Sequence, residues 1–97
     1  MQTYVFLYNF TDQGIKEIKN SPENVKNATE AWEAMGGKVH GVYCLQGPYD
    51  FMSIGEAPND EVAATFALAL GAKGSVRTLS MRAFTAEEFT KIVNNLP

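Results

Sequence analysis

Apolar residues occupy both faces of the segment at residues 2–10. Val5 and Leu7 fall on one side of an alternating pattern. Aromatic and β-branched residues in alternation are typical of a β-strand, and apolar residues on both sides predict a strand covered on two faces. We expect two covering layers, one of which a second subunit can supply. The other side of the strand carries an aromatic set: Tyr4, Phe6, Tyr8 and Phe10.

Helical spacing appears at residues 21–35. Ser21 and Pro22 favour a helix start, because serine caps free amides and proline at the first helical position loses no hydrogen bond. The glycines at 36 and 37 favour its end. A shorter helix is predicted over residues 12–19. The longer helix has one apolar face, on which Trp32 is expected to lie in the core: Val25, Ala28, Trp32 and Met35.

Three further strands and two further helices complete the pattern. Residues 38–46 and 49–56 are predicted strands, joined as a hairpin across Gly47-Pro48. A helix is predicted from the Asn59 cap to about Gly71, and a fourth strand over residues 75–84. Thr85 and Glu88 form a capping box that begins a terminal helix. The apolar stripe of that helix is Phe89, Ile92, Val93 and Leu96.

The predicted order is β-α-β-β-α-β with an extra C-terminal helix. Short connections and right-handed crossovers favour an α+β, ferredoxin-like sandwich, a four-stranded antiparallel sheet with helices on one face. We expect one domain over residues 1–97. The aromatic set is expected on the uncovered sheet face. Because a large exposed apolar patch usually marks an interface, we expect a homodimer whose sheets pack face to face, with a higher oligomer as an open possibility.

Composition and charge exclude several partners. Eight Lys and Arg residues against eleven Asp and Glu residues give a net charge of −3, and a pI of about 5.0 argues against nucleic-acid binding. Cys44 is the only cysteine, so no internal disulfide is expected and a reducing compartment is favoured. No leader or membrane-spanning pattern occurs, so we expect a cytoplasmic protein without a membrane partner.

Residues 47–50 read Gly-Pro-Tyr-Asp and resemble the G-x-Y-D signature of the GYD domain family. Segments 3–5, 9–14, 56–58, 76–78 and 82–85 resemble the family's other landmarks in order, so the resemblance covers nearly the whole chain. It implies a dimeric α/β barrel of ferredoxin-like protomers, in a prokaryotic family without an assigned activity. Ser53 and Gly55 are small residues at positions where the family pattern has bulkier β-branched ones, and we expect them to widen an internal cavity. Leu79 stands where a polar or acidic residue is common, and we expect it to make that cavity more apolar.

Tyr49 and Asp50 of this motif have two interpretations. An aspartate after a tight turn commonly accepts amide hydrogen bonds, and a tyrosine hydroxyl commonly anchors a corner. At the mouth of a cavity, the same pair would bind a ligand, with Tyr49 as donor and Asp50 as acceptor or base. Tyr8 and Asn9 are further ligand candidates. Arg77 is another, because an arginine pointing into a dimer interior needs an anionic partner.

His40, the only histidine, is the second candidate for a general base besides Asp50, and a position facing solvent or a partner subunit is its alternative. Alternation places His40 and Cys44 on one strand face, with Val39 and Tyr43 on the other. Cys44 is expected to be buried. No His, Cys and carboxylate spacing predicts a metal site, and no cofactor motif occurs.

Three functions fit these observations. The first is a homodimeric protein that binds a small, partly apolar molecule or serves as an assembly module. The second is a cofactor-independent enzyme of the monooxygenase or isomerase kind, which would use Tyr4 and Tyr8 with Asn9, His40 or Asp50. The third is a ligand-sensing regulatory domain whose effector binds between subunits.

Overall fold

Four antiparallel strands form one sheet in the order β2-β3-β1-β4. The computed structural model describes residues 1–97. β1 (Gln2–Phe10) lies in the centre and pairs with both β3 (Phe51–Ala57) and β4 (Val76–Ala83), while β2 (Lys38–Cys44) is an edge strand paired with β3. This topology confirms the predicted ferredoxin-like α+β fold.

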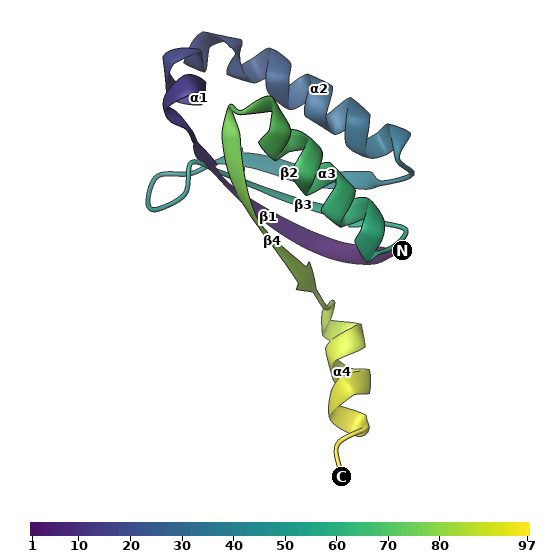
Figure 1. The fold of residues 1–97 in the computed structure, drawn as a ribbon. Coiled ribbons are helices and arrows are strands. Elements are labelled where there is room, and N and C mark those ends of the chain that lie inside the picture. The colour runs from purple at the N-terminus through teal and green to yellow at the C-terminus, as the bar shows by residue number, and fades with distance from the viewer.

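The helices α2 (Ser21–Ala34) and α3 (Asp60–Lys73) cover one face of the sheet (Figure 1). The predicted helix at residues 12–19 is wrong as a single element. It divides into α1 (Asp12–Lys16) and the 3-10 helix η1 (Ile18–Asn20), because Glu17 between them leaves helical geometry at φ −102° and ψ 27°. The last helix, α4 (Ala86–Asn94), extends away from the sheet. None of the helices is long and apolar enough to span a membrane.

The aromatic side of β1 faces the helices, so the prediction that it lies on the uncovered face is wrong. The strand register gives the reason. Phe6 lies opposite Ser53 and Tyr4 lies opposite Gly55, and these small partners on β3 leave depth under the helices for large rings. The rings of Trp32 and Phe66 from α2 and α3 fill that depth, with 4.9 Å between their centroids in an edge-to-face arrangement. Trp32 is therefore a core residue, as predicted.

The position of Trp32 also explains why residue 55 is a glycine. A Cβ at position 55 would lie 2.6 Å from the carbonyl oxygen of Lys38 and 3.1 Å from Trp32 Nε1. The indole nitrogen in turn donates a 3.0 Å hydrogen bond to that same carbonyl. The close approach of the ring to the sheet therefore requires a residue without a side chain.

A bulge in β2 overturns the predicted alternation of that strand. The register shifts between Val39 and Gly41, and Val39 and Cys44 pair with residues of the helix-covered face. His40 instead reaches Glu56 on the uncovered face. Cys44 is exposed, contrary to prediction, because it is the last residue of an edge strand.

The uncovered face of the sheet is aliphatic for the most part, and we call it the open face. It takes its residues from all four strands in register. Several of its large side chains are strongly exposed, with Tyr43 at 53% and Leu79 at 48%. The open face consists of Val5, Leu7, Tyr43, Met52, Ile54, Leu79 and Met81.

Candidate ligand-binding site

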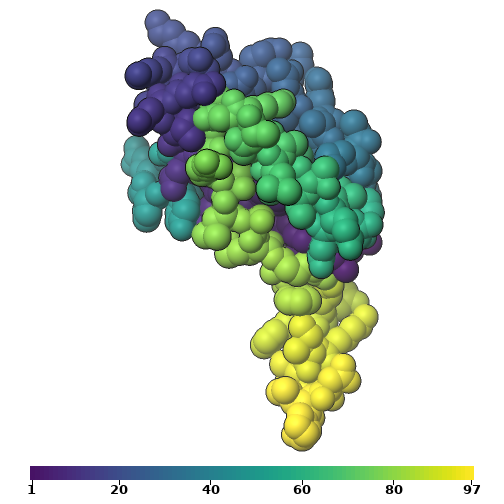
Figure 2. All heavy atoms as spheres, in the orientation of Figure 1, coloured from purple at the N-terminus to yellow at the C-terminus, as the bar shows by residue number.

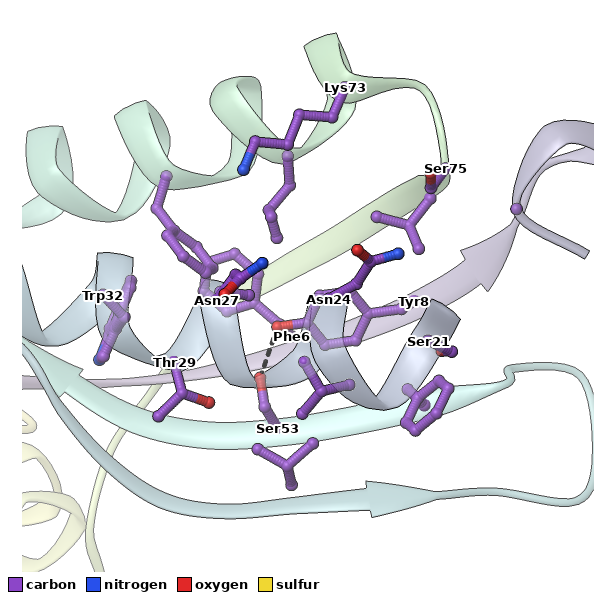
Figure 3. A pocket seen from close by; sticks show the side chains of 18 of the residues that line it. Phe6, Tyr8, Ser21, Asn24, Asn27, Thr29, Trp32, Ser53, Lys73 and Ser75 are labelled. Carbon is purple, nitrogen blue, oxygen red and sulfur yellow. Dashed lines mark hydrogen bonds between the residues drawn. The ribbon is translucent and has the colours of Figure 1, made fainter. Parts of the chain in front are cut away.

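A cavity of about 280 Å³ lies between the sheet and the helices (Figure 3). Ser53 and Gly55, the two small residues expected to widen an internal cavity, both line it. Leu79 does not, because it lies on the open face, so that expectation is wrong. Aromatic and aliphatic side chains from β1, α2, β3 and α3 make up most of its wall, including Phe6, Tyr8, Val25, Trp32, Phe51 and Leu70.

A hydrogen-bonded polar pair lies on the sheet side of the cavity. The hydroxyls of Tyr8 and Ser53 lie 2.6 Å apart and share a hydrogen bond across neighbouring strands. Burial raises the pKa of the Tyr8 phenol above its ordinary value of 10.0, and the hydrogen bond with Ser53 partly opposes that rise. The phenol therefore stays neutral near pH 7 and can offer a ligand a hydrogen bond.

Polar side chains line the gap between α2 and α3. Asn24 and Asn27 come from α2, and Lys73 comes from the last turn of α3 (Figure 3). Glu17, from the short segment between α1 and η1, lines the cavity as well. A ligand in this cavity would have an apolar body against the rings and polar groups near these side chains.

Asp50 of the Gly-Pro-Tyr-Asp motif supports the sheet. Its carboxylate accepts a 2.8 Å hydrogen bond from the amide of Phe10, and its own amide donates at 2.8 Å to the carbonyl of Tyr8. Its carbonyl accepts from the amide of Leu45, which closes the loop between β2 and β3. These contacts match the turn interpretation of Asp50. Neither Asp50 nor Tyr49 lines the cavity.

The other predicted site residues lie apart from the cavity. His40 Nε2 is 2.8 Å from Glu56 Oε2 on the side of the open face. Asn9 lies opposite Arg77 in the register of β1 and β4. The guanidinium of Arg77 lies beside α3, where a Cβ at Gly71 would be 3.7 Å from Nη1. No group of three His, Cys, Asp or Glu side chains could hold a metal ion.

Of the residues predicted to bind a ligand, only Tyr8 lines the cavity. Sequence reasoning did not assign Trp32 to the site, nor the asparagines of α2. A usable signal was present in the small residues Ser53 and Gly55, spaced two apart on one strand face across from a helix that carries Ala28. Small side chains facing one another across two layers leave unfilled volume.

The fold and the cavity define this chain as a small ferredoxin-like domain with a largely apolar pocket between its two layers. The GYD domain model matches residues 4–93, and the chain belongs to the GYD domain family. A Thermus thermophilus protein described as "Glutamine synthetase and cystathionine beta-lyase binding protein" is 33% identical over 84 residues, which are 86% of this chain and 88% of that protein.

Solved structures share the fold. The crystal structure of TTHA0845 from Thermus thermophilus has a TM-score of 0.57 at 23% identity, covering 89% of this chain and 96% of that one. The crystal structure of FFRP-DM1 has a TM-score of 0.59 at 20% identity, covering 87% and 100%. Hypothetical protein PHS023 from Pyrococcus horikoshii has a TM-score of 0.54 at 21% identity, covering 88% and 92%. These likenesses confirm the architecture.

Proposed function

We propose that this protein is a binding protein that holds a small, partly apolar molecule in the cavity between its sheet and its helices. The observation that carries this proposal is the cavity itself, whose aromatic wall is interrupted by the Tyr8–Ser53 pair. Its volume of about 280 Å³ is near the lower end of the range for small-ligand pockets. A single ring or a short branched chain with one hydroxyl or carbonyl group suits it.

Binding without catalysis has more support than the enzyme alternative. General acid–base catalysis works best with a group that titrates near the operating pH. The buried phenol in the cavity, Tyr8, has its pKa raised further from neutrality. The candidate bases His40 and Asp50 lie elsewhere, one paired with Glu56 and the other holding the end of β1.

A pair of serine variants tests the site. Ser53 and Ser80 both lie opposite Phe6, one on each neighbouring strand, but only Ser53 lines the cavity. Native mass spectrometry of the purified protein shows any ligand already bound. Titration with cyclohexanol follows binding through Trp32, the only tryptophan. Ser53→Leu should abolish the response and Ser80→Leu should keep it. A response that survives Ser53→Leu would place the ligand elsewhere.

A homodimer formed through the open face is part of the same proposal. The aliphatic side chains of that face have no cover in a single chain, and a second copy would supply a matching surface. A ring of dimers is compatible with this contact. Sedimentation velocity of the full chain measures the state directly, and a monomer at all concentrations would refute this part of the proposal.

Binding of a partner enzyme is a second candidate function. The observation in its favour is the Thermus thermophilus relative, whose description states that it binds glutamine synthetase and cystathionine β-lyase. Calorimetric titration of this chain into each of those two Thermus enzymes would test it, with an unrelated enzyme of similar charge as the control. Heat evolved equally with the control would count against a specific interaction.

A further inference from the structure

The C-terminal segment carries a row of apolar side chains that its own chain does not cover. We call residues 84–96, which include α4, the arm. The arm projects beyond the rest of the molecule as a separate lobe (Figures 1 and 2). No residue of α4 is buried. The apolar stripe of the arm comprises Phe84 at 56% exposure, Phe89 at 61%, Ile92 and Val93 at 43% each, and Leu96 at 67%.

The arm leaves the sheet in a defined direction. Thr85 and Glu88 close a reciprocal capping box at the start of α4. Arg82, at the end of β4, lies 4.5 Å from the centre of the Phe84 ring, and its Nη2 is 3.5 Å from Glu88 Oε2. The same guanidinium donates to the carbonyls of Thr3 and Ala83. These contacts tie the first turn of the arm to the edge of the sheet.

The surface of the chain is larger than a chain of this mass normally exposes. A folded monomer of 10.7 kDa typically exposes about 5,500 Å², and this chain exposes 6515 Å². Its radius of gyration is 14.6 Å, against about 12.5 Å for a compact domain of this length. The excess of about 1,000 Å² is comparable to the roughly 800 Å² that each partner buries in a standard protein interface.

We propose that the apolar stripe of the arm packs against a second copy of this chain, so that two protomers exchange their arms. The inference rests on the proposed homodimer. The chain has one other large uncovered apolar surface, which is the open face. Leu79 and Met81 of that face lie on β4, and β4 leads directly into the arm. A two-fold axis that packs the two open faces together also lets each copy lay its arm along the rim of the partner's open face, which covers both surfaces with no other partner.

Paired double variants of the full chain test the arm. Phe89→Glu with Ile92→Glu places two carboxylates in the stripe, and Thr90→Glu with Asn94→Glu places the same two charges off it on α4. By sedimentation velocity, the wild type and the off-stripe control should have twice the mass of one chain. The stripe variant should dissociate, with its dissociation constant raised at least about 100-fold, because two large side chains lose their burial at each arm.

Each other outcome has a distinct meaning. A monomeric wild type would overturn both the homodimer and the arm exchange. An unchanged dissociation constant in the stripe variant would overturn the arm exchange alone, and equal dissociation in the control would show that charge, not the stripe, is responsible. Far-ultraviolet circular dichroism and Trp32 fluorescence verify that each variant is folded, since α4 does not contact the aromatic core.

Cross-linking identifies what the arm contacts. ¹⁴N and ¹⁵N chains that carry a benzophenone at Thr90→Cys, in a Cys44→Ser background, are unfolded, mixed in equal amounts and refolded so that mixed dimers form, and are then irradiated. Cross-linked peptides should join differently labelled chains. Peptides that join only like-labelled chains would show that the arm folds back onto its own body, and this result would overturn the proposal.

Discussion

The two faces of the sheet differ in side-chain type although they come from the same strands. On β1, Tyr4 and Phe6 point to the helices while Val5 and Leu7 point to the open face. Rings on the covered face interlock at fixed edge-to-face angles. The open face has linear and branched aliphatic chains, which adapt more readily to another flat surface. One face thus completes a core within the chain, and the other suits a partner.

Removing a large side chain from each face should give the largest contrast in stability. Trp32→Ala deletes a ring that contacts Phe6 and Phe66 and leaves the carbonyl of Lys38 without its donor. We expect a loss of about 3–5 kcal/mol in the free energy of unfolding, measured by urea denaturation.

Leu79→Ala is the matched change on the open face, where the side chain is 48% exposed in one chain. The free energy of unfolding should fall by less than about 1 kcal/mol in dilute protein, and the loss should grow with protein concentration, because the removed side chain belongs to the contact of the proposed dimer. If Trp32→Ala and Leu79→Ala lowered the free energy of unfolding equally at every protein concentration, the open face would belong to the core of the single chain in the same way as the covered face.

A methyl group added under Trp32 should have a smaller effect. In Gly55→Ala the new Cβ would meet the Lys38 carbonyl at 2.6 Å, so we expect a loss of about 1–3 kcal/mol. Gly71→Ala is the control. There the Cβ has only an ordinary contact with Arg77, and alanine should stabilise α3 by about 0.5–1 kcal/mol. Thermal unfolding of both variants measures this, and a neutral Gly55→Ala would show that the indole can move.

The periodicity of the sequence predicted the order of the elements and the capping box at Thr85, because these depend on local residue types. It did not predict which side of β1 the helices cover. Both sides are apolar, and the choice depends on the small partners Ser53 and Gly55 on a strand some 45 residues away. The bulge at His40 likewise depends on pairing with β3, and one inserted residue reverses the face of every later residue in that strand.

The candidate site was harder to predict than the fold. The motif at residues 47–50 drew attention to Tyr49 and Asp50, but the carboxylate of Asp50 bonds to the amide of Phe10. A cavity is a volume left between side chains of several elements, so no single sequence motif predicts it. Tyr8, which lines the cavity, was named as a candidate because it is a polar aromatic residue on the aromatic side of β1, whereas the rest of the wall depends on how the layers pack.

Alkaline pH should weaken the covered face through Tyr4. Burial, followed by its hydrogen bond to Asp60, raises the pKa of the Tyr4 phenol to about 12 from 10.0. The folded state holds this proton more tightly than the unfolded state, so the stabilisation is complete below pH 10 and is lost as the pH rises towards 12. Urea denaturation at a series of pH values between 9 and about 11.5 measures the slope of the free energy of unfolding against pH. Tyr4→Phe should reduce this slope, and the slope that remains belongs to Tyr8, whose phenol pKa is also raised by burial.

Loss of the α4 cap should have the smallest effect and should be confined to the arm. Thr85→Ala removes the hydroxyl that accepts from the Glu88 amide, at a cost of about 1 kcal/mol to the helix. Thr90→Ala is the control, because that hydroxyl bonds only within the helix, to the Ala86 carbonyl. Amide hydrogen exchange in α4 should accelerate in Thr85→Ala, while exchange in β1 stays unchanged because α4 does not contact the aromatic core.

Acid should reproduce the effect of Thr85→Ala in the wild type. The backbone amide of Thr85 holds the pKa of the Glu88 carboxyl below its ordinary 4.5, with help from the Thr85 hydroxyl and Arg82. A lowered pKa in the folded state means that the cap is at full strength above pH 4.5 and weakens as the pH falls below it. If the arms are exchanged, dimer dissociation should follow α4 fraying in both acid and Thr85→Ala. Fraying without any change in dimer affinity would show that the dimer depends on the open face alone.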